Sequence, residues 1–360
     1  MLEIPRRSQV IAAHRQHGGG VAAVLPVHSP RALLRAFNLL PVEVWGPPKA
    51  NASLGAAHLQ PYVCSIARNA LGFLLSGGLD VVNAILVPHT CDTLQGFGSL
   101  LLDFVKPRQP VLTLYLPRGD PENAVPFLAD ELRRLYQKLQ VLTGACPDEQ
   151  ELMECIWREE AADRLLAELH RRRAYLPLSL LDFYRLVRSR EYLPAEDFCQ
   201  LARSALEMCS HEPLHRAKPL LLSGILPEPM ELLESIELLG GWIAADDLAC
   251  CGRRCYSAGV SEDPFLRLAE SMLSAAPDPL RGCEVRARRE YLLQQARDYG
   301  AVGIVFYLIK FCEPELFYTP LLRAELQLNG LRVLVLENDL NDGLSQACLT
   351  RLQAFLEALD

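Results

Sequence analysis

The chain has 360 residues, half of them apolar and 22% charged, so it can bury a large core and is not a disordered protein. Its 44 acidic residues outnumber 36 basic ones, and the net charge of −8 argues against a nucleic acid or an anionic membrane surface as partner. No apolar run approaches the roughly 20 residues that a membrane-spanning helix needs. Because residues 1–7 also lack the apolar stretch of a signal peptide, we expect a cytoplasmic protein.

Short apolar runs typical of β-strands occur towards both ends of the chain. They cover residues 21–27, 81–87, 111–116, 220–225, 242–245, 303–309 and 331–336. Most are apolar on both faces, as are parallel strands that helices cover on each side. Helical patterns lie between them, at 30–40, 66–75 and 320–328, so both ends of the chain are predicted to form βαβ units.

The middle of the chain differs, because residues 126–209 show only helical periodicity. Leu128, Leu132, Leu135 and Leu139, for example, form one apolar stripe at helical spacing. We therefore predict an α/β fold with two parallel-sheet domains, residues 1–125 and 216–360, joined by a helical insertion over residues 126–215. The length of the chain also favours more than one core.

Three of the twelve cysteines lie where α/β proteins carry their chemistry, at or near the carboxyl ends of predicted strands. Cys91 follows the strand at 81–87, Cys312 follows the strand at 303–309, and Cys64 lies in a loop that opens a helix. A helix N-terminus stabilises a thiolate and so favours a metal ligand. None of the three belongs to a Cys-x-x-Cys motif, so their spacing leaves open both a shared metal or cluster site and ordinary buried thiols.

A second group of cysteines follows the strand at 242–245. Its members are Cys250, Cys251, Cys255 and, further along the chain, Cys283. Adjacent cysteines rarely bind one metal because neighbouring side chains diverge. An equal alternative to metal binding is that one of the two thiols is buried and the other faces a cleft. Arg253 and Arg254 beside them are predicted to neutralise thiolates or a phosphate-bearing substrate.

Four segments together resemble the 2-hydroxyacyl-CoA dehydratase / benzoyl-CoA reductase family. They are Gln-Pro-Tyr-Val-Cys-Ser at 60–65, His-Thr-Cys-Asp-Thr-Leu-Gln at 89–95, Ala-Asp-Asp-Leu-Ala-Cys-Cys-Gly-Arg-Arg at 245–254 and Gly-Ile-Val-Phe-Tyr-Leu-Ile-Lys-Phe-Cys-Glu-Pro-Glu-Leu-Phe at 303–317. The resemblance runs in order from about residue 30 to the end. Each segment alone is unspecific, but the combination is specific.

The resemblance implies two Rossmann-like domains with a [4Fe–4S] cluster in the cleft between them. Its three ligands would be Cys64, Cys91 and Cys312, which leaves one iron open. It also implies an ATP-dependent iron–sulfur activator that supplies electrons at low potential for radical dehydration or reduction of an acyl-CoA. The expected assembly is a homodimer or a heterodimer with a paralogous subunit.

One departure from the family keeps other functions open. Family members commonly carry acidic residues after the proline of the first helix, whereas Arg31 and Ala32 follow Pro30 here. The same superfamily includes reductases of small molecules with a double-cubane [8Fe–9S] cluster, for which the second cysteine group would supply thiols. A non-catalytic electron-relay or structural subunit is the third alternative. Iron content per chain separates these possibilities.

Two residues near the predicted ligands are secondary candidates. His89 precedes Cys91 by two residues, and is predicted either to donate a hydrogen bond to cluster or substrate or to cap the backbone. Lys310 precedes Cys312 by two residues, and either offsets cluster charge or remains solvated.

Overall fold

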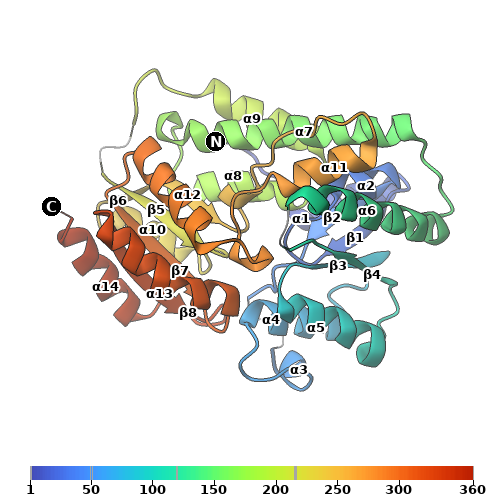
Figure 1. Cartoon of the computed structure of the whole chain (residues 1–360), viewed down its shortest axis with the longest axis horizontal. Helices are drawn as coiled ribbons and strands as arrows, with labels where there is room; N and C mark the ends of the chain where they lie inside the picture. The colour runs from blue at the N-terminus through green and yellow to red at the C-terminus, as the bar shows by residue number, and fades with distance from the viewer. Residues whose placement is uncertain (1, 49, 51, 119–120, 215–216, 360) are drawn as a thin grey trace.

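The computed structural model describes residues 2–48, 50, 52–118, 121–214 and 217–359. Within these residues the chain forms two four-stranded sheets with parallel pairing throughout. The N-terminal sheet has the order β2-β1-β3-β4, from β1 (Gly20–Val24), β2 (Leu39–Glu43), β3 (Ala84–His89) and β4 (Val111–Tyr115). The C-terminal sheet has the order β6-β5-β7-β8, from β5 (Lys218–Gly224), β6 (Gly241–Leu248), β7 (Gly303–Ile309) and β8 (Arg332–Asn338). The predicted α/β fold with two Rossmann-like sheets is therefore confirmed (Figure 1).

One strand was not predicted. The helical pattern at 30–40 ends early, because α2 covers Arg31–Ala36 and β2 begins at Leu39. Pro41 lies inside β2, where it cannot donate a ladder hydrogen bond. The sheet tolerates this proline because β2 is an edge strand that pairs only with β1 among the described strands.

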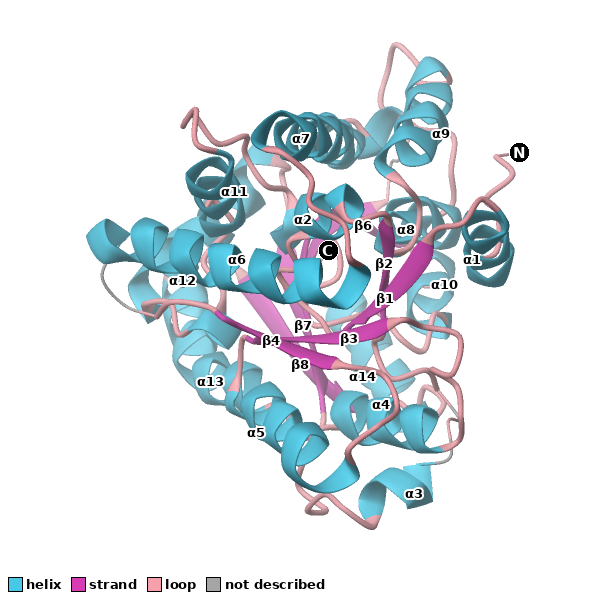
Figure 2. Ribbon diagram, turned by 90° about the vertical axis from the view of Figure 1, so that its right-hand side faces the viewer, coloured by secondary structure: helices cyan, strands magenta, loops and turns pink. Residues whose placement is uncertain are grey.

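The N-terminal sheet is covered on both faces, which explains why its strands are apolar throughout. Along β1, Val21 and Ala23 face one apolar core, and Ala22 and Val24 face another. The first core includes side chains of α4 (Ser65–Leu75) and α5 (Asp92–Leu100), and the second includes side chains of α2, α6 (Pro121–Thr143) and α7 (Glu149–Arg171). Figure 2 shows helices on both sides of the strands.

Helices connect the two sheets along the chain. After α6 and α7 come α8 (Leu180–Arg188) and α9 (Ala195–Glu207), which lie between β4 and β5 in sequence. Phe183 of α8 and Phe198 of α9 belong to the first core, which also contains Leu220 and Leu222 of β5. One continuous apolar core therefore joins a face of the N-terminal sheet to a face of the C-terminal sheet.

The C-terminal sheet is covered in the same way. Side chains of α10 (Glu231–Leu238) and α14 (Gln346–Glu357) pack on the face that joins the shared core. The opposite face carries α12 (Val285–Asp298) and α13 (Glu313–Leu328). The helix α11 (Pro264–Leu273) crosses instead to the other half, where Leu268 and Met272 pack with α6 in the second core.

Two shorter helices complete the N-terminal half. They are α1 (Arg7–Gln16), which precedes the first strand, and α3 (Ala52–Ala56). Each helix of the described residues is too short or too polar to cross a bilayer.

Candidate functional site

The three predicted ligand cysteines each begin a helix. Cys64 is the N-cap residue of α4, Cys91 of α5 and Cys312 of α13, and all three side chains are buried. Cys91 follows β3 and Cys312 follows β7, which occupy the same third place in the two sheets. In each sheet this strand lies next to the first strand in sequence, β1 or β5. The connections from these two neighbouring strands run in opposite directions, and α/β folds bind ligands at such a point.

The three thiols lie close enough to affect one another's ionisation. Burial, together with the neighbouring Cys64, raises the pKa of the Cys91 thiol to about 12. Burial also raises the pKa of Cys312 well above its usual range, and both Cys64 and Cys91 add to this shift. The structure therefore brings the three sulfur atoms from three helices into one electrostatically connected site.

Backbone dipoles act on these thiols in the opposite direction. Burial raises the pKa of Cys64, but the N–H groups of Ala67 and Ile66 in the first turn of α4 lower it. None of the three N-cap sulfur atoms makes a capping hydrogen bond of ordinary geometry. Three thiolates here would repel each other in a medium of low dielectric, so they require a cationic group between them.

The three thiols are donors of the kind that bind an iron–sulfur cluster. Among the described residues, no three His, Cys, Asp or Glu side chains lie close enough together to hold one ion. In a [4Fe–4S] cluster each cysteine binds a different iron, so the ligands are spread around the cluster. Three buried thiols at helix N-termini fit such a group because it needs soft, anionic donors.

The contact between the two halves of the molecule places Cys64 at this site. The Leu340 N–H, in the loop after β8, donates to Oγ of Ser65 at 3.1 Å. Arg68 of α4 pairs with Asp339 at 3.0 Å, and Asn69 bonds to Asn341. The first turns of α4 are therefore fixed to the C-terminal half, beside the loop that follows its edge strand.

The second cysteine group lies among buried charged side chains. The Sγ atoms of Cys250 and Cys251 are 3.3 Å apart, and Cys251 is influenced by Asp246 as well as by its neighbour. Burial and then Asp246 raise the pKa of Cys255 to about 12. Burial also raises the pKa of Cys283 to about 11, with Arg288 as the largest opposing influence.

Arg253 and Arg254 bind carboxylates and also act on the second cysteine group, so their role in neutralising thiolates stays a prediction. Both guanidinium groups are buried and paired with carboxylates, while Arg254 lowers the pKa of Cys255 and Arg253 lowers the pKa of Cys283. Arg253 binds Asp247, Asp278 and Glu315. Arg254 forms a two-point contact with Glu43, at the end of β2. These buried carboxylates need charged partners of their own.

His89 is one of the residues that line an open cavity. The cavity, of about 460 Å³, lies between the end of β4, α5 and the start of α6, and Tyr115, Arg118 and Phe127 also line it. The His89 ring packs edge-on against Tyr115, and no described residue hydrogen-bonds to its two buried ring nitrogens. Arg118 donates to the carbonyl of Thr90 at 3.1 Å, which fixes the loop that carries Cys91. The cavity thus reaches a residue that precedes a predicted ligand by two positions.

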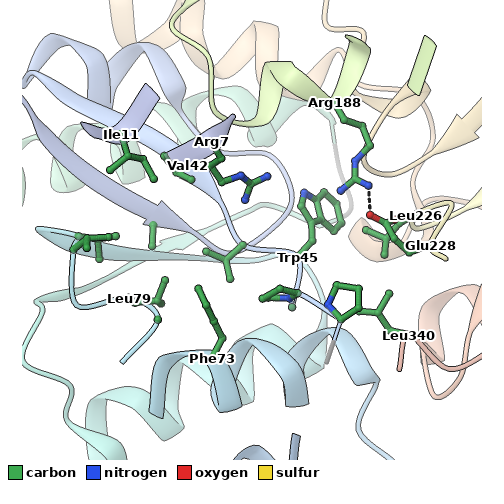
Figure 3. Close-up of a pocket in the computed structure, with 18 residues that line it drawn as sticks. Arg7, Ile11, Val42, Trp45, Phe73, Leu79, Arg188, Leu226, Glu228 and Leu340 are labelled. Carbon is green, nitrogen blue, oxygen red and sulfur yellow. Dashed lines mark hydrogen bonds and ion pairs between the residues drawn. The ribbon is translucent and has the colours of Figure 1, made fainter. Parts of the chain in front are cut away.

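A second cavity, of about 380 Å³, is mainly apolar and is shown in Figure 3. Trp45 and Phe73 line it, and the ion pair between Arg188 and Glu228 lies at its edge. None of the cysteines predicted as ligands lines this cavity. Its contact with the cysteine site is indirect, through Leu340, which lines the cavity and bonds to Ser65.

Comparison with known proteins identifies the family. The sequence model of the protein family described as 2-hydroxyglutaryl-CoA dehydratase, D-component, matches residues 26–359. The chain belongs to this family.

Relatives cover nearly the whole chain. The lactoyl-CoA dehydratase subunit beta of Anaerotignum propionicum is 24% identical, with 95% of this chain and 92% of the relative aligned. The (R)-phenyllactyl-CoA dehydratase beta subunit of Clostridium sporogenes is 23% identical, with 100% and 96% aligned. A benzoyl-CoA reductase subunit of Thauera aromatica is 24% identical, with 94% and 90% aligned. The family resemblance predicted from the four segments is confirmed, and these relatives are all subunits of enzymes.

Sequence reasoning missed the buried carboxylates of the site. Glu315, three residues after Cys312, is 1% exposed and pairs with Arg253. The signal was present, since an acidic residue in the first turn of a helix, at the third position after a cysteine cap, can act on that cysteine. The partners Glu43 and Asp278 gave no comparable signal.

Proposed function

We propose that this chain is the cluster-carrying subunit of an enzyme that dehydrates or reduces an acyl-CoA, with a [4Fe–4S] cluster bound by Cys64, Cys91 and Cys312. One observation supports the proposal: three buried cysteines each begin a helix, two of them after the equivalent strands β3 and β7, and Cys64 and Cys91 both act on the ionisation of Cys312. When bound, the cluster would supply one-electron reduction at low potential and an open iron.

The residues of this chain would prepare the site in three ways. Burial keeps water away from the thiols, and the first-turn N–H groups of α4, α5 and α13 stabilise their anionic form. The Ser65–Leu340 contact holds the two halves in register at the site. His89 lines an open cavity and would hydrogen-bond to a substrate there once one of its buried ring nitrogens turns towards it.

The acyl-CoA substrate and the partners follow from the relatives. Two of them are named beta subunits of CoA-thioester dehydratases, and one is a subunit of benzoyl-CoA reductase. We extend this to a second, paralogous or identical subunit, an ATP-dependent iron–sulfur activator, and action in the cytoplasm. Arg31 is buried and pairs with Glu159 at 3.1 Å, so the position where family members carry acid is here part of an internal ion pair. This difference keeps both dehydration and reduction within the proposal.

The double-cubane reductase remains the second candidate, on one observation. Cys250 and Cys251 place two buried sulfur atoms 3.3 Å apart. Their neighbours include Asp246 and Arg188, which already form ion pairs with Arg173 and Glu191. A second cubane there would have to displace these pairs, so we favour the single cluster.

The test couples the cluster to its electron source. The full chain is purified without oxygen, mixed with a purified activator of a family dehydratase, and followed by the visible absorbance of the cluster after ATP is added. Bleaching that needs both ATP and activator, followed by turnover of lactoyl-CoA or benzoyl-CoA with a partner subunit, supports the proposal. A cluster that bleaches but converts neither thioester points to the small-molecule reductase. If the chain never acquires iron, the non-catalytic structural subunit is the remaining alternative.

A further inference from the structure

Glu315 lies in the first turn of the helix that Cys312 begins. Cys312 is the N-cap residue of α13, and Glu315 is its third residue, with 1% of the side chain exposed. The side chains of an N-cap residue and of the third helical residue lie next to each other. The carboxylate of Glu315 is therefore placed near the sulfur atom of Cys312, in a region that water does not screen.

Arg253 holds this carboxylate in place. Its Nη2 lies 2.6 Å from Oε1 of Glu315, and its other nitrogens contact Asp278 at 3.0 Å and Asp247 at 3.2 Å. The Arg253 side chain is completely buried. Because one guanidinium group serves three carboxylates, it compensates the charge of Glu315 only in part.

Other charged groups surround Arg253, among them Arg254 and Arg281, which help to lower the pKa of the nearby His28. Arg288 adds a second buried guanidinium group, which binds Asp247 and the carbonyl of Pro277. Asp278 also contacts Nε2 of His28 at 3.1 Å, and burial lowers the pKa of that imidazole and favours its neutral form. The direct ion pairs thus join two guanidinium groups to three carboxylates, one of which lies beside the predicted ligand.

We infer that Glu315, fixed by Arg253, is a positioning residue that lowers the reduction potential of the cluster bound at Cys312. The inference rests on the proposed function. A buried negative charge near a redox centre opposes the arrival of an electron, and second-shell charge is one of the protein's means of setting such potentials. Arg253 limits this effect and keeps the carboxylate from reaching the cluster as a ligand.

The chain offers a matched control in the same helical turn. Glu313, the first residue of α13, is exposed, whereas Glu315 is buried. Glu315→Gln and Glu313→Gln each remove one negative charge and change no backbone group. Since solvent screens the exposed charge, only the buried substitution is expected to change the potential strongly.

The experiment is an anaerobic redox titration of the full chain with its reconstituted cluster, followed by electron paramagnetic resonance. Glu315→Gln should increase the equilibrium constant for one-electron reduction at least tenfold, which corresponds to about 59 mV. Glu313→Gln should change it by less than about threefold. Arg253→Met should decrease the equilibrium constant for reduction, because it removes a positive charge. If Arg253→Met does not fold, the double variant Arg253→Met/Glu315→Gln, which has one buried carboxylate fewer, takes its place in the comparison.

Two failures can be told apart. Equal potentials for Glu315→Gln and Glu313→Gln, with the cluster intact, would overturn the role of Glu315 and leave the proposed function standing. Wild-type protein that binds no cluster would instead overturn the proposed function, and this inference with it.

Discussion

Arg253 and Arg254 are adjacent in the chain, yet their guanidinium groups bind carboxylates of different halves of the molecule. Arg253 contacts Asp247 and Glu315 of the C-terminal half, and Arg254 contacts Glu43, at the end of β2 in the N-terminal sheet. The short helical turn at Gly252–Arg254 therefore ties the two sheets together through buried charge. Through Glu315 the same turn also contacts the helix that Cys312 begins.

The Arg254–Glu43 pair is expected to be important for stability. Arg254→Met leaves the Glu43 carboxylate buried without its charged partner, and should lower the free energy of unfolding by about 3–5 kcal/mol. The double variant Arg254→Met/Glu43→Gln should lose less, because no buried charge remains. Urea denaturation measures both, with Arg286→Met, in an exposed pair with Glu290, as the control expected to be as stable as wild type. A single variant no less stable than this control would contradict the expectation.

Stability should fall in acid through Asp278. Burial alone would raise its pKa, but Arg253 and His28 outweigh burial and hold the pKa of Asp278 well below its usual range. The unfolded carboxyl group, with a pKa of about 3.9, binds its proton first. The stabilisation is thus complete above about pH 4 and is lost as the pH falls below that value.

The check for Asp278 is the free energy of unfolding measured from neutral pH to about pH 3. Asp278→Asn should be less stable than wild type at neutral pH and should lose less stability below about pH 4. His28, whose pKa burial lowers, adds a separate loss that begins near pH 6.5 in wild type. Parallel curves for the two proteins below pH 4 would show that Asp278 does not contribute.

Two glycines of α5 should respond differently to alanine. A Cβ atom at Gly98 would lie 2.7 Å from Nε2 of His89, whereas a Cβ atom at Gly96 would meet no atom within 4 Å. Gly96→Ala should therefore raise the free energy of unfolding by about 0.5–1 kcal/mol, as expected for a helix interior. Gly98→Ala should bring no such gain, because His89 is confined by Tyr115 and must move. Equal gains in thermal denaturation would show that His89 is not confined.

The sequence predicted local elements well, because period and composition are local properties. The runs at 81–87 and 303–309 fall on β3 and β7, and Cys64 opens a helix as predicted. It did not predict β2, because Leu39 and Leu40 continue a helical pattern and Pro41 is unusual in a strand.

Contacts between distant segments were not predictable in this way. Arg254 and Glu43 are 211 residues apart in sequence, so no spacing connects them. The same is true of α11, whose packing against α6 depends on the way the chain crosses between the two halves. The convergence of Cys64, Cys91 and Cys312 was expected only from the family resemblance and the rule that ligands bind at the carboxyl ends of parallel strands.

The most direct measurement is the iron and acid-labile sulfide content of anaerobically reconstituted wild-type chain and single Cys→Ser variants. Substitution of Cys64, Cys91 or Cys312 should each abolish or greatly reduce a content of about four irons per chain. Substitution of Cys251, or of the exposed Cys146, should leave it unchanged. Full iron retention in the Cys312→Ser variant, or loss of iron on substitution of Cys251 alone, would contradict the three-cysteine site.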